Sequence, residues 1–249
     1  MADITGIPYA ERVLIVYTSQ IIVATILAIL TINLYLRFRA RRLPATKYLT
    51  LVSLFLTLTS CMQVIGANTI EVILGVISIG WGLAFSMSAI ANIFLYLFML
   101  EIFSEGRSAG GVKLRVFIVV ELAVAVLLPI LAPLSSIAPI FNVPVLLVLI
   151  THLAFALALY ITLAIWTTAS IRKTTDATAR RGFSLIRLAA FAIIIAYCFF
   201  VLDRVWTNLY EPEAYTIWVI IAWIMGGVAG VLLYSGFVLP TRMRETKRS

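Results

Sequence analysis

The stretch 13–42, VLIVYTSQIIVATILAILTINLYLRFRARR, decides the fold class of this chain. It carries no charge from Val13 to Leu36, and its end holds four basic residues, Arg37, Arg39, Arg41 and Arg42. An apolar run of about 20 residues is long enough to cross the hydrocarbon core of a bilayer. A basic cluster directly after such a run is typical of the cytoplasmic side. The stretch therefore predicts a membrane-spanning helix that ends in the cytoplasm.

The composition extends this interpretation to the whole chain of 249 residues, of which 63% are hydrophobic and 12% charged. Soluble domains are about 45–50% apolar and about 25% charged, so a soluble enzyme, a disordered chain and a collagen-like fibre are excluded. At roughly 20 residues per span, seven helices fit and twelve do not. We expect an all-α, seven-helix membrane domain over 1–240 and a basic tail over 241–249. The expected spans are 13–36, 48–66, 73–100, 114–132, 144–170, 185–208 and 215–239.

The basic residues predict the orientation. Of the 19 Lys and Arg, all except Arg12 and Arg204 lie after spans one, three, five and seven. The positive-inside rule then places the N-terminus outside and the C-terminus in the cytoplasm of a multi-pass cell-membrane protein. The first run is too long for a signal-peptide core, so we expect no cleavage. The net charge of +8 is spread over short loops, which indicates the lipid bilayer and no nucleic acid as partner.

The sequence lacks the residues that retinal binding, zinc binding and common catalytic sites require. A retinal Schiff base needs a lysine inside a span, but the lysines lie in loops or the tail: Lys47, Lys113, Lys173 and Lys247. One histidine, His152, is too few for a clustered zinc site. No phosphate-binding glycine loop or catalytic set is present. We therefore expect no retinal, other cofactor, metal or enzymatic activity.

Six polar residues inside spans are the candidates for ligand binding or relay, because ionisable groups at the bilayer centre cost about 2.5–3.5 kcal/mol. They are Glu121, His152, Asp203, Asn92, Gln20 and Gln63. Counting depth at about 1.5 Å per residue gives two layers, with Asn92 and Glu121 in the inner layer and the other four in the outer. His152 and Glu121 are then not expected to touch. The outer layer is interpreted as a ligand pocket and the inner pair as a relay. The alternative is ordinary interhelical hydrogen bonds of about 0.6 kcal/mol each.

Small residues predict close helix packing in two spans. Gly80, Ala84 and Ser88 recur every four residues in span three and are followed by Asn92, while Gly226 and Gly230 form a GxxxG pattern in span seven. Such residues let two helix backbones approach each other. Packing within the chain is one interpretation, and a homodimer face is the other.

One passage resembles a known family. Residues 95–120 read LYLFMLEIFSEGRSAGGVKLRVFIVV, and LLPILAPL follows at 127–134. The passage is similar to the third and fourth helices of the seven-helix sensory regions at the N-termini of prokaryotic histidine kinases, over roughly 40 of the 249 residues. The matching positions are Phe98, Leu100, Glu101, Phe103, Gly106 and Pro129. Because no kinase domain is present, the resemblance implies a receptor-like sensor that signals to a separate cytoplasmic partner.

Two other functions fit the sequence. Seven outward-starting helices can be divided into three, one and three, the layout of parallel-repeat solute transporters with span four as the linker. Ile79-Gly80-Trp81 echoes Ile221-Ala222-Trp223 in this division, but Pro44 has no counterpart after span five. A non-catalytic subunit of a larger membrane complex is the other alternative.

Overall fold

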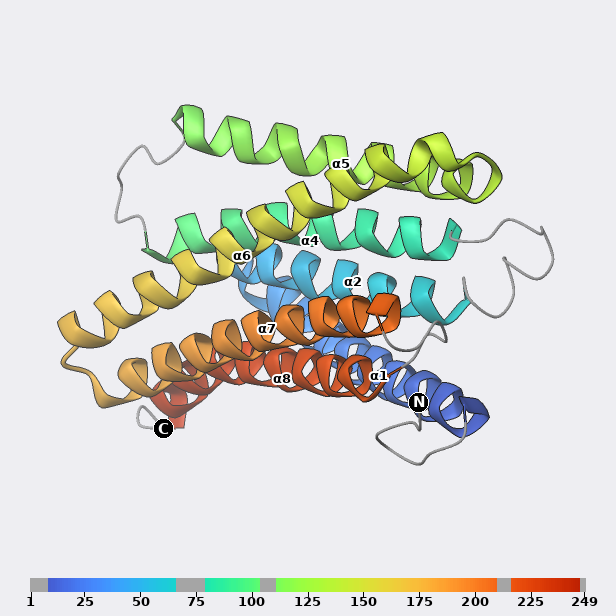
Figure 1. Cartoon of the computed structure of the whole chain (residues 1–249). Helices are drawn as coiled ribbons and strands as arrows, with labels where there is room; N and C mark the ends of the chain where they lie inside the picture. Colours follow the sequence, from blue (N-terminus) through green and yellow to red (C-terminus); the bar gives the residue numbers. More distant parts are fainter. Residues whose placement is uncertain (1–8, 66–78, 104–110, 210–215, 247–249) are drawn as a thin grey trace. The chain divides into compact units, whose positions relative to one another are not determined.

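The computed structural model describes residues 9–65, 79–103, 111–209 and 216–246, and every regular element in these ranges is a helix (Figure 1). Seven of the helices are long and apolar enough to cross a membrane. This confirms an all-α protein of the multi-pass membrane type, while its orientation stays a prediction. The elements are α1 (Tyr9–Arg41), α2 (Pro44–Ile65), α4 (Ile79–Phe103), α5 (Val112–Ile137), η2 (Pro139–Phe141), α6 (Asn142–Lys173), α7 (Ala177–Leu209) and α8 (Ile217–Thr246).

The chain forms two compact units. The first unit comprises Met1–Ile26 and Tyr160–Ser249, and the second comprises Leu27–Leu159, so α1 and α6 each contribute to both. In the second unit α4 lies between α2 and α5, and in the first unit α7 lies along α8 (Figure 1). The transporter layout predicted span four, now α5, as a linker between two halves. The units do not match that division, because α5 packs inside the second unit.

The helices continue past the expected membrane boundaries. α1 runs through Arg37 and Arg39 to Arg41, and Arg42 ends it in a left-handed conformation with φ 54°. Pro44 then begins α2, since a proline fits the first helical position. Arginine favours helix and its long side chain can reach the headgroups, so charge alone does not stop a helix. The start of the expected span 73–100 lies outside the described residues.

Helix α5 continues past the expected end of span four at residue 132, because it includes both Pro129 and Pro133 and ends at Ile137. Pro129 lacks an N–H, so the carbonyl of Ala125 loses the donor that it has in a regular helix. Membrane helices tolerate such prolines, because packing against neighbouring helices compensates for the lost bond. The backbone N–H of Ala138 donates to the carbonyl of Leu134 and closes the helix. Residues 134–137, which follow the expected span, therefore belong to α5.

The outward surfaces of the helices suit lipid. Large apolar side chains face outward, for example Val119 with 64% and Leu147 with 60% of the side chain exposed. Exposed hydroxyls on Thr18, Thr25 and Thr151 each donate to a carbonyl four residues earlier, at 2.8 Å. This bond satisfies the hydroxyl without water. These faces are consistent with a bilayer as the surrounding medium.

A glycine sets the distance between α4 and α5. A β-carbon on Gly82 would lie 2.8 Å from the carbonyl oxygen of Leu128 and 3.1 Å from Cα of Pro129. Any larger residue would push the two backbones apart. Gly80, Ala84 and Ser88 are buried on the same helix, as the packing interpretation predicts.

In the first unit the close approaches involve other glycines than those expected. A β-carbon on Gly227 would lie 3.0 Å from Val23 Cγ2, and one on Gly236 would lie 2.7 Å from the carbonyl oxygen of Gly182. At Gly226 it would meet no atom within 4 Å, and Gly230 is half-buried. On α8 it is Gly227, one residue after Gly226, that packs on Val23 of α1, and the homodimer interpretation of Gly226 and Gly230 stays a prediction.

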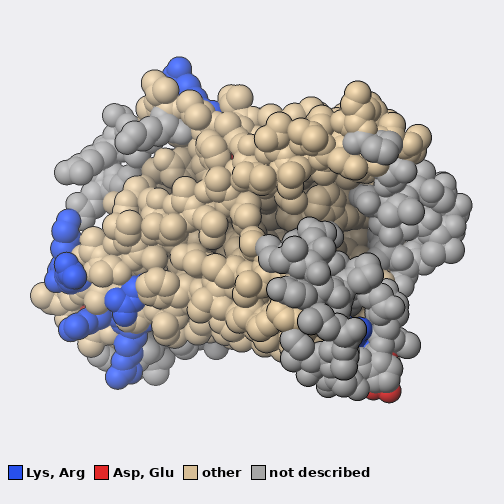
Figure 2. All heavy atoms as spheres, in the orientation of Figure 1, with Lys and Arg blue, Asp and Glu red and all other residues tan. Residues whose placement is uncertain are grey.

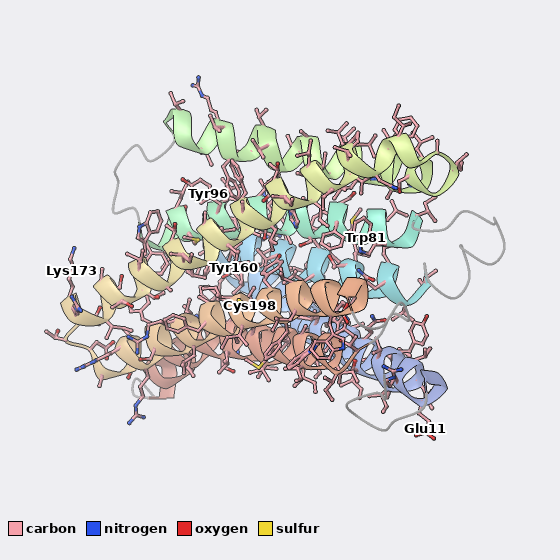
Figure 3. The ribbon with its side chains drawn as sticks, in the orientation of Figure 1. Glu11, Trp81, Tyr96, Tyr160, Lys173 and Cys198 are labelled. Atoms are coloured by element: carbon pink, nitrogen blue, oxygen red, sulfur yellow. The ribbon has the colours of Figure 1, made fainter. Side chains whose placement is uncertain are left out.

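Charge separates along the first unit. Glu11 in α1 and Lys173 in α6 lie at opposite ends of it (Figure 3). Basic residues flank the α6–α7 connection, and Figure 2 shows several separate groups of Lys and Arg atoms at that end of the view, beside uncharged helix surface. Asp176 holds this connection, since its side chain accepts from the N–H of Thr178 at 3.0 Å. Basic side chains are thus presented on an ordered helical turn.

Candidate functional site

Three of the six polar candidates meet in the second unit. His152 Nδ1 of α6 lies 2.9 Å from Glu121 Oε2 of α5, and Asn92 Nδ2 of α4 donates to Glu121 Oε1 at 3.3 Å. The residues are almost completely enclosed, with 0% exposure for Glu121 and His152 and 1% for Asn92. We call Asn92, Glu121 and His152 the buried polar cluster. It joins three helices through a single carboxyl group.

The helical repeat directs each member of the buried polar cluster inward. Ala89, Val124 and Val148 lie three or four residues from the cluster members on α4, α5 and α6 and pack together. Residues at these spacings share one face of a helix. Because Ala89, Val124 and Val148 pack together, the cluster members on the same helix faces also point into the space between α4, α5 and α6. Aliphatic packing thus closes one side of the cluster.

An aromatic layer closes the other side. Tyr96 packs on Phe117 with ring centroids 4.9 Å apart, and Phe117 packs on Phe155 at 5.9 Å. These rings follow Asn92 by four residues, precede Glu121 by four and follow His152 by three. The ring of Phe85 stands edge-on to that of His152, with centroids 5.8 Å apart and an angle of 89°. The cluster is therefore a polar layer between two apolar layers.

The cluster can share and hold a proton. A 2.9 Å contact between Nδ1 and Oε2 requires one proton between them, either as an ion pair or as a neutral acid and base. An isolated buried charge is costly, and a hydrogen-bonded partner offsets that cost. His152 Nε2, in contrast, is buried without a hydrogen-bond partner in the described part of the chain. Within the described ranges no three His, Cys, Asp or Glu side chains gather as a metal site would require.

The predicted separation of His152 from Glu121 is wrong. The depths were counted along upright helices from assumed ends. α6 is longer than the expected span, with 32 residues, and it crosses α5 obliquely (Figure 1). Tilt shortens the rise of a helix across the membrane, so the two long side chains reach the same level. The proximity of Asn92 to Glu121 agrees with the prediction.

Asp203 has a local role in the first unit. Its Oδ1 accepts from the Thr216 hydroxyl at 2.7 Å and from the Thr216 N–H at 3.3 Å. Thr216 Oγ1 in turn accepts from the N–H of Trp218 at 3.2 Å, which caps the start of α8. Phe199, four residues before Asp203, stacks on Trp218. We call Asp203 and Thr216 the Asp203 cap, and its geometry favours the packing interpretation.

The two glutamines lie in different units. Gln20 belongs to the first unit and is 4% exposed, and its Oε1 has no hydrogen-bond partner among residues that the structure describes. Gln63 is half-buried near the end of α2. Over the described ranges no hydrogen bond joins Gln63 to His152, although both lie in the second unit. The proposed outer layer, which would combine residues of both units, stays a prediction.

A set of hydroxyls between α1 and α2 was missed in the sequence. Thr31 Oγ1 donates to Ser53 Oγ at 2.8 Å, and Ser53 Oγ donates to the carbonyl of Leu27 at 3.2 Å. Thr57 lies 3.4 Å from the Thr31 hydroxyl. Serine and threonine are common in membrane helices, where they bond to their own backbone, so residue type gave no signal. Only the spacing of Ser53 and Thr57, one turn apart, pointed to a shared face.

The chain matches no protein-family model, no curated protein and no solved structure. The resemblance to kinase sensory regions stays a prediction. Of its residues, Phe98 is fully buried, Glu101 is exposed, Pro129 lies within α5 and Gly106 lies outside the described residues. Any functional conclusion therefore depends on the chemistry of the buried polar cluster.

Proposed function

We propose that this multi-pass membrane protein is a receptor-like sensor, in which the buried polar cluster responds to a signal from outside the cell or from the membrane. A separate cytoplasmic protein receives the signal. The observation that carries the proposal is the fully buried Glu121, which bonds to Asn92 on α4 and to His152 on α6.

The arrangement suits a switch, because one carboxyl group holds three helices. If a ligand or a proton changes the partners of Glu121, the preferred positions of α4 and α6 relative to α5 change together. A signal shifts such an equilibrium only by its difference in affinity for the two arrangements. The cluster supplies that difference, since its hydrogen bonds can exist in more than one pattern.

The cost of the cluster supports a role beyond packing. Well-packed apolar residues of similar volume are often as stable as a buried ion pair, or more so. The layers beside it, which include Val124 and Phe117, contain no carboxyl or imidazole group among the residues that form them. A hydrophobic layer at the level of Glu121 would therefore hold the same helices together without an ionisable group.

The α6–α7 connection is the proposed docking site of the partner. α6 carries His152 and ends in Arg172 and Lys173, and α7 begins with Arg180 and Arg181 close by. A rearrangement at His152 is passed along a continuous helix to this basic surface. The surface suits an acidic face on a cytoplasmic protein.

Site-specific photo-cross-linking in the native membrane tests the proposal. A photoreactive residue replaces Thr178, and cross-linked proteins are identified in cells that carry the otherwise unchanged chain, E121Q or E101Q. Glu101 is an exposed carboxylate on α4 and serves as the matched control. We expect a cytoplasmic protein whose cross-linking yield changes by about fivefold or more in E121Q, the lower range of allosteric coupling. The yield in E101Q should stay the same.

Two results would contradict the sensor. One is the same set and yield of cross-linked proteins in E121Q as in the unchanged chain. The other is uptake of small solutes by proteoliposomes that E121Q abolishes, which would make the protein a transporter. A panel of sugars, amino acids and organic acids, with protein-free liposomes as the control, covers that alternative.

A further inference from the structure

The His152 imidazole has two nitrogens, and only one of them has a hydrogen-bond partner among the described residues. Nδ1 faces Glu121, whereas Nε2 is enclosed and has no hydrogen-bond partner among the described residues. More than nine in ten buried polar groups have a partner in the protein or in ordered water. Nε2 therefore marks the place of a partner that the described chain does not supply.

The net charge of the buried polar cluster determines whether the partner of His152 Nε2 is a hydrogen-bond donor or an acceptor. A net charge inside the membrane is costly, so the favoured state of the cluster is neutral overall. Glu121 is the only ionisable side chain that contacts His152 within the described ranges. Among the described side chains of α2, α4, α5 and the second-unit part of α6, the other ionisable groups form no hydrogen bond or ion pair with His152: Lys47, Tyr48, Cys61, Tyr96, Glu101 and Arg115.

Neutrality places a proton on Nε2 in both arrangements of the pair. If Glu121 is ionised, His152 is an imidazolium and both of its nitrogens carry a proton. If Glu121 is protonated, the proton is on Oε2, because Oε1 accepts from Asn92 Nδ2; the Oε2 hydroxyl then donates to Nδ1, and the single imidazole proton is on Nε2. In either case Nε2 is a donor, so the missing partner is a hydrogen-bond acceptor.

We propose that Nε2 of His152 binds the oxygen of a neutral hydrogen-bond acceptor. An anionic ligand would bring an uncompensated charge into the layer, which neutrality disfavours. The neighbouring side chains are apolar, with Phe85 edge-on to the imidazole and Trp81 on Phe85. The ligand is thus an apolar molecule with a carbonyl oxygen, or a single water molecule. This inference rests on the proposed function, since it names what the responsive cluster of the sensor binds.

Nitrogen NMR on lipid-embedded protein tests the inference directly. His152 is the only histidine in the chain, so labelling with ¹⁵N-histidine gives one pair of imidazole signals. The first measurement detects the proton on Nε2 through its N–H dipolar coupling at neutral pH. The second detects transfer of magnetisation from water to that proton. The third adds 2-heptanone with a ¹³C-labelled carbonyl and measures ¹³C–¹⁵N dephasing at Nε2.

We expect a protonated Nε2 in contact with water when no ketone is present, and dephasing at Nε2 but not at Nδ1 when the ketone is bound. Water contact that the ketone does not displace identifies water as the ligand. Displacement identifies an apolar carbonyl compound. A bare Nε2, or a protonated Nε2 that contacts neither probe, overturns the inference.

E121Q is the matched variant, because glutamine keeps the volume but has no proton to share. The amide can donate to Nδ1 or accept from it, so Nε2 is no longer forced to carry the proton. We expect its protonated fraction to fall from near completion to a mixture. An unchanged fraction contradicts the neutrality argument. These spectra need no partner protein, so failure of the cross-linking experiment and failure of the binding site are distinguishable.

Discussion

The buried polar cluster and the Asp203 cap use the same functional group in opposite ways. Asp203 is half-buried near the end of α7, and its partner Thr216 lies 13 residues away at the start of the next helix. Glu121 is fully buried, and its partners are 29 and 31 residues away on two other helices. The first carboxylate completes a chain turn, and the second links distant segments. A membrane carboxylate therefore indicates function only when its depth and its partners are known.

The largest expected effect tests the cluster. E121A removes the hydrogen-bond partner of both His152 and Asn92 and leaves two buried polar groups behind. Breaking a buried pair in this way costs about 3–5 kcal/mol. The free energy of unfolding, measured by steric trapping in bicelles, should fall by that amount. The exposed control E101A should stay within about 0.5 kcal/mol of the unchanged chain, and equal losses would show that Glu121 has no special role.

A smaller effect is expected where α4 meets α5 beside the cluster. The added methyl of G82A would lie 2.8 Å from the Leu128 oxygen, so the helices must separate. Overpacking of this kind costs about 1–3 kcal/mol. The same assay on G226A provides the control, since that methyl meets open space. If G82A is as stable as G226A, the two helices do not pack as closely as described.

The Asp203 cap is expected to contribute less. T216V removes the hydroxyl that bonds to Asp203 and to the N–H of Trp218, and loss of a cap costs about 1 kcal/mol. T216S keeps the hydroxyl and should retain most of the stability in the same unfolding assay. Cross-linking of the cytoplasmic partner should not change in either variant. If T216V altered it as strongly as E121Q, the distinction between a packing and a functional carboxylate would fail.

The smallest effect concerns a polar contact without an ionisable group. S53A removes the hydroxyl that links α1 and α2, and such interhelical bonds average about 0.6 kcal/mol. Ser19 bonds only to a carbonyl of its own helix, so S19A is the control. A difference of about 0.6 kcal/mol between the two unfolding free energies is expected. A loss in S53A as large as in E121A would mean that burial, and not charge, sets the cost.

Hydropathy predicted the membrane helices because a span needs only enough apolar residues in a row. It did not predict their ends, since an arginine such as Arg39 extends a helix as well as it marks a boundary. Pro133 likewise stays helical, because tertiary packing outweighs its lost hydrogen bond. Local sequence thus determines that a helix exists, while packing determines where it stops.

Residue type predicted the members of the buried polar cluster, but the contact between His152 and Glu121 was not predicted. Ionisable groups inside spans singled out Glu121 and His152, since their burial is costly. Their contact depends on the tilt of α6, which the sequence of one helix does not specify. The glycine stripe had the same difficulty, because Gly82 makes the closest approach to α5 although Gly80 began the regular repeat. The four-residue spacing of small residues predicts which face of a helix packs closely. The position of the neighbouring helix determines which residue on that face makes the contact.

The length of α6 has a mechanical consequence. Its 32 residues extend over about 48 Å, whereas the hydrocarbon core is about 30 Å thick. Arg172 and Lys173 at its end favour the headgroup region, so a thicker or thinner bilayer changes the inclination of the helix. His152 belongs to α6, so a change in the inclination of α6 moves His152 relative to Glu121 on α5. We therefore expect the thickness of the surrounding membrane to affect the hydrogen bond between these two residues.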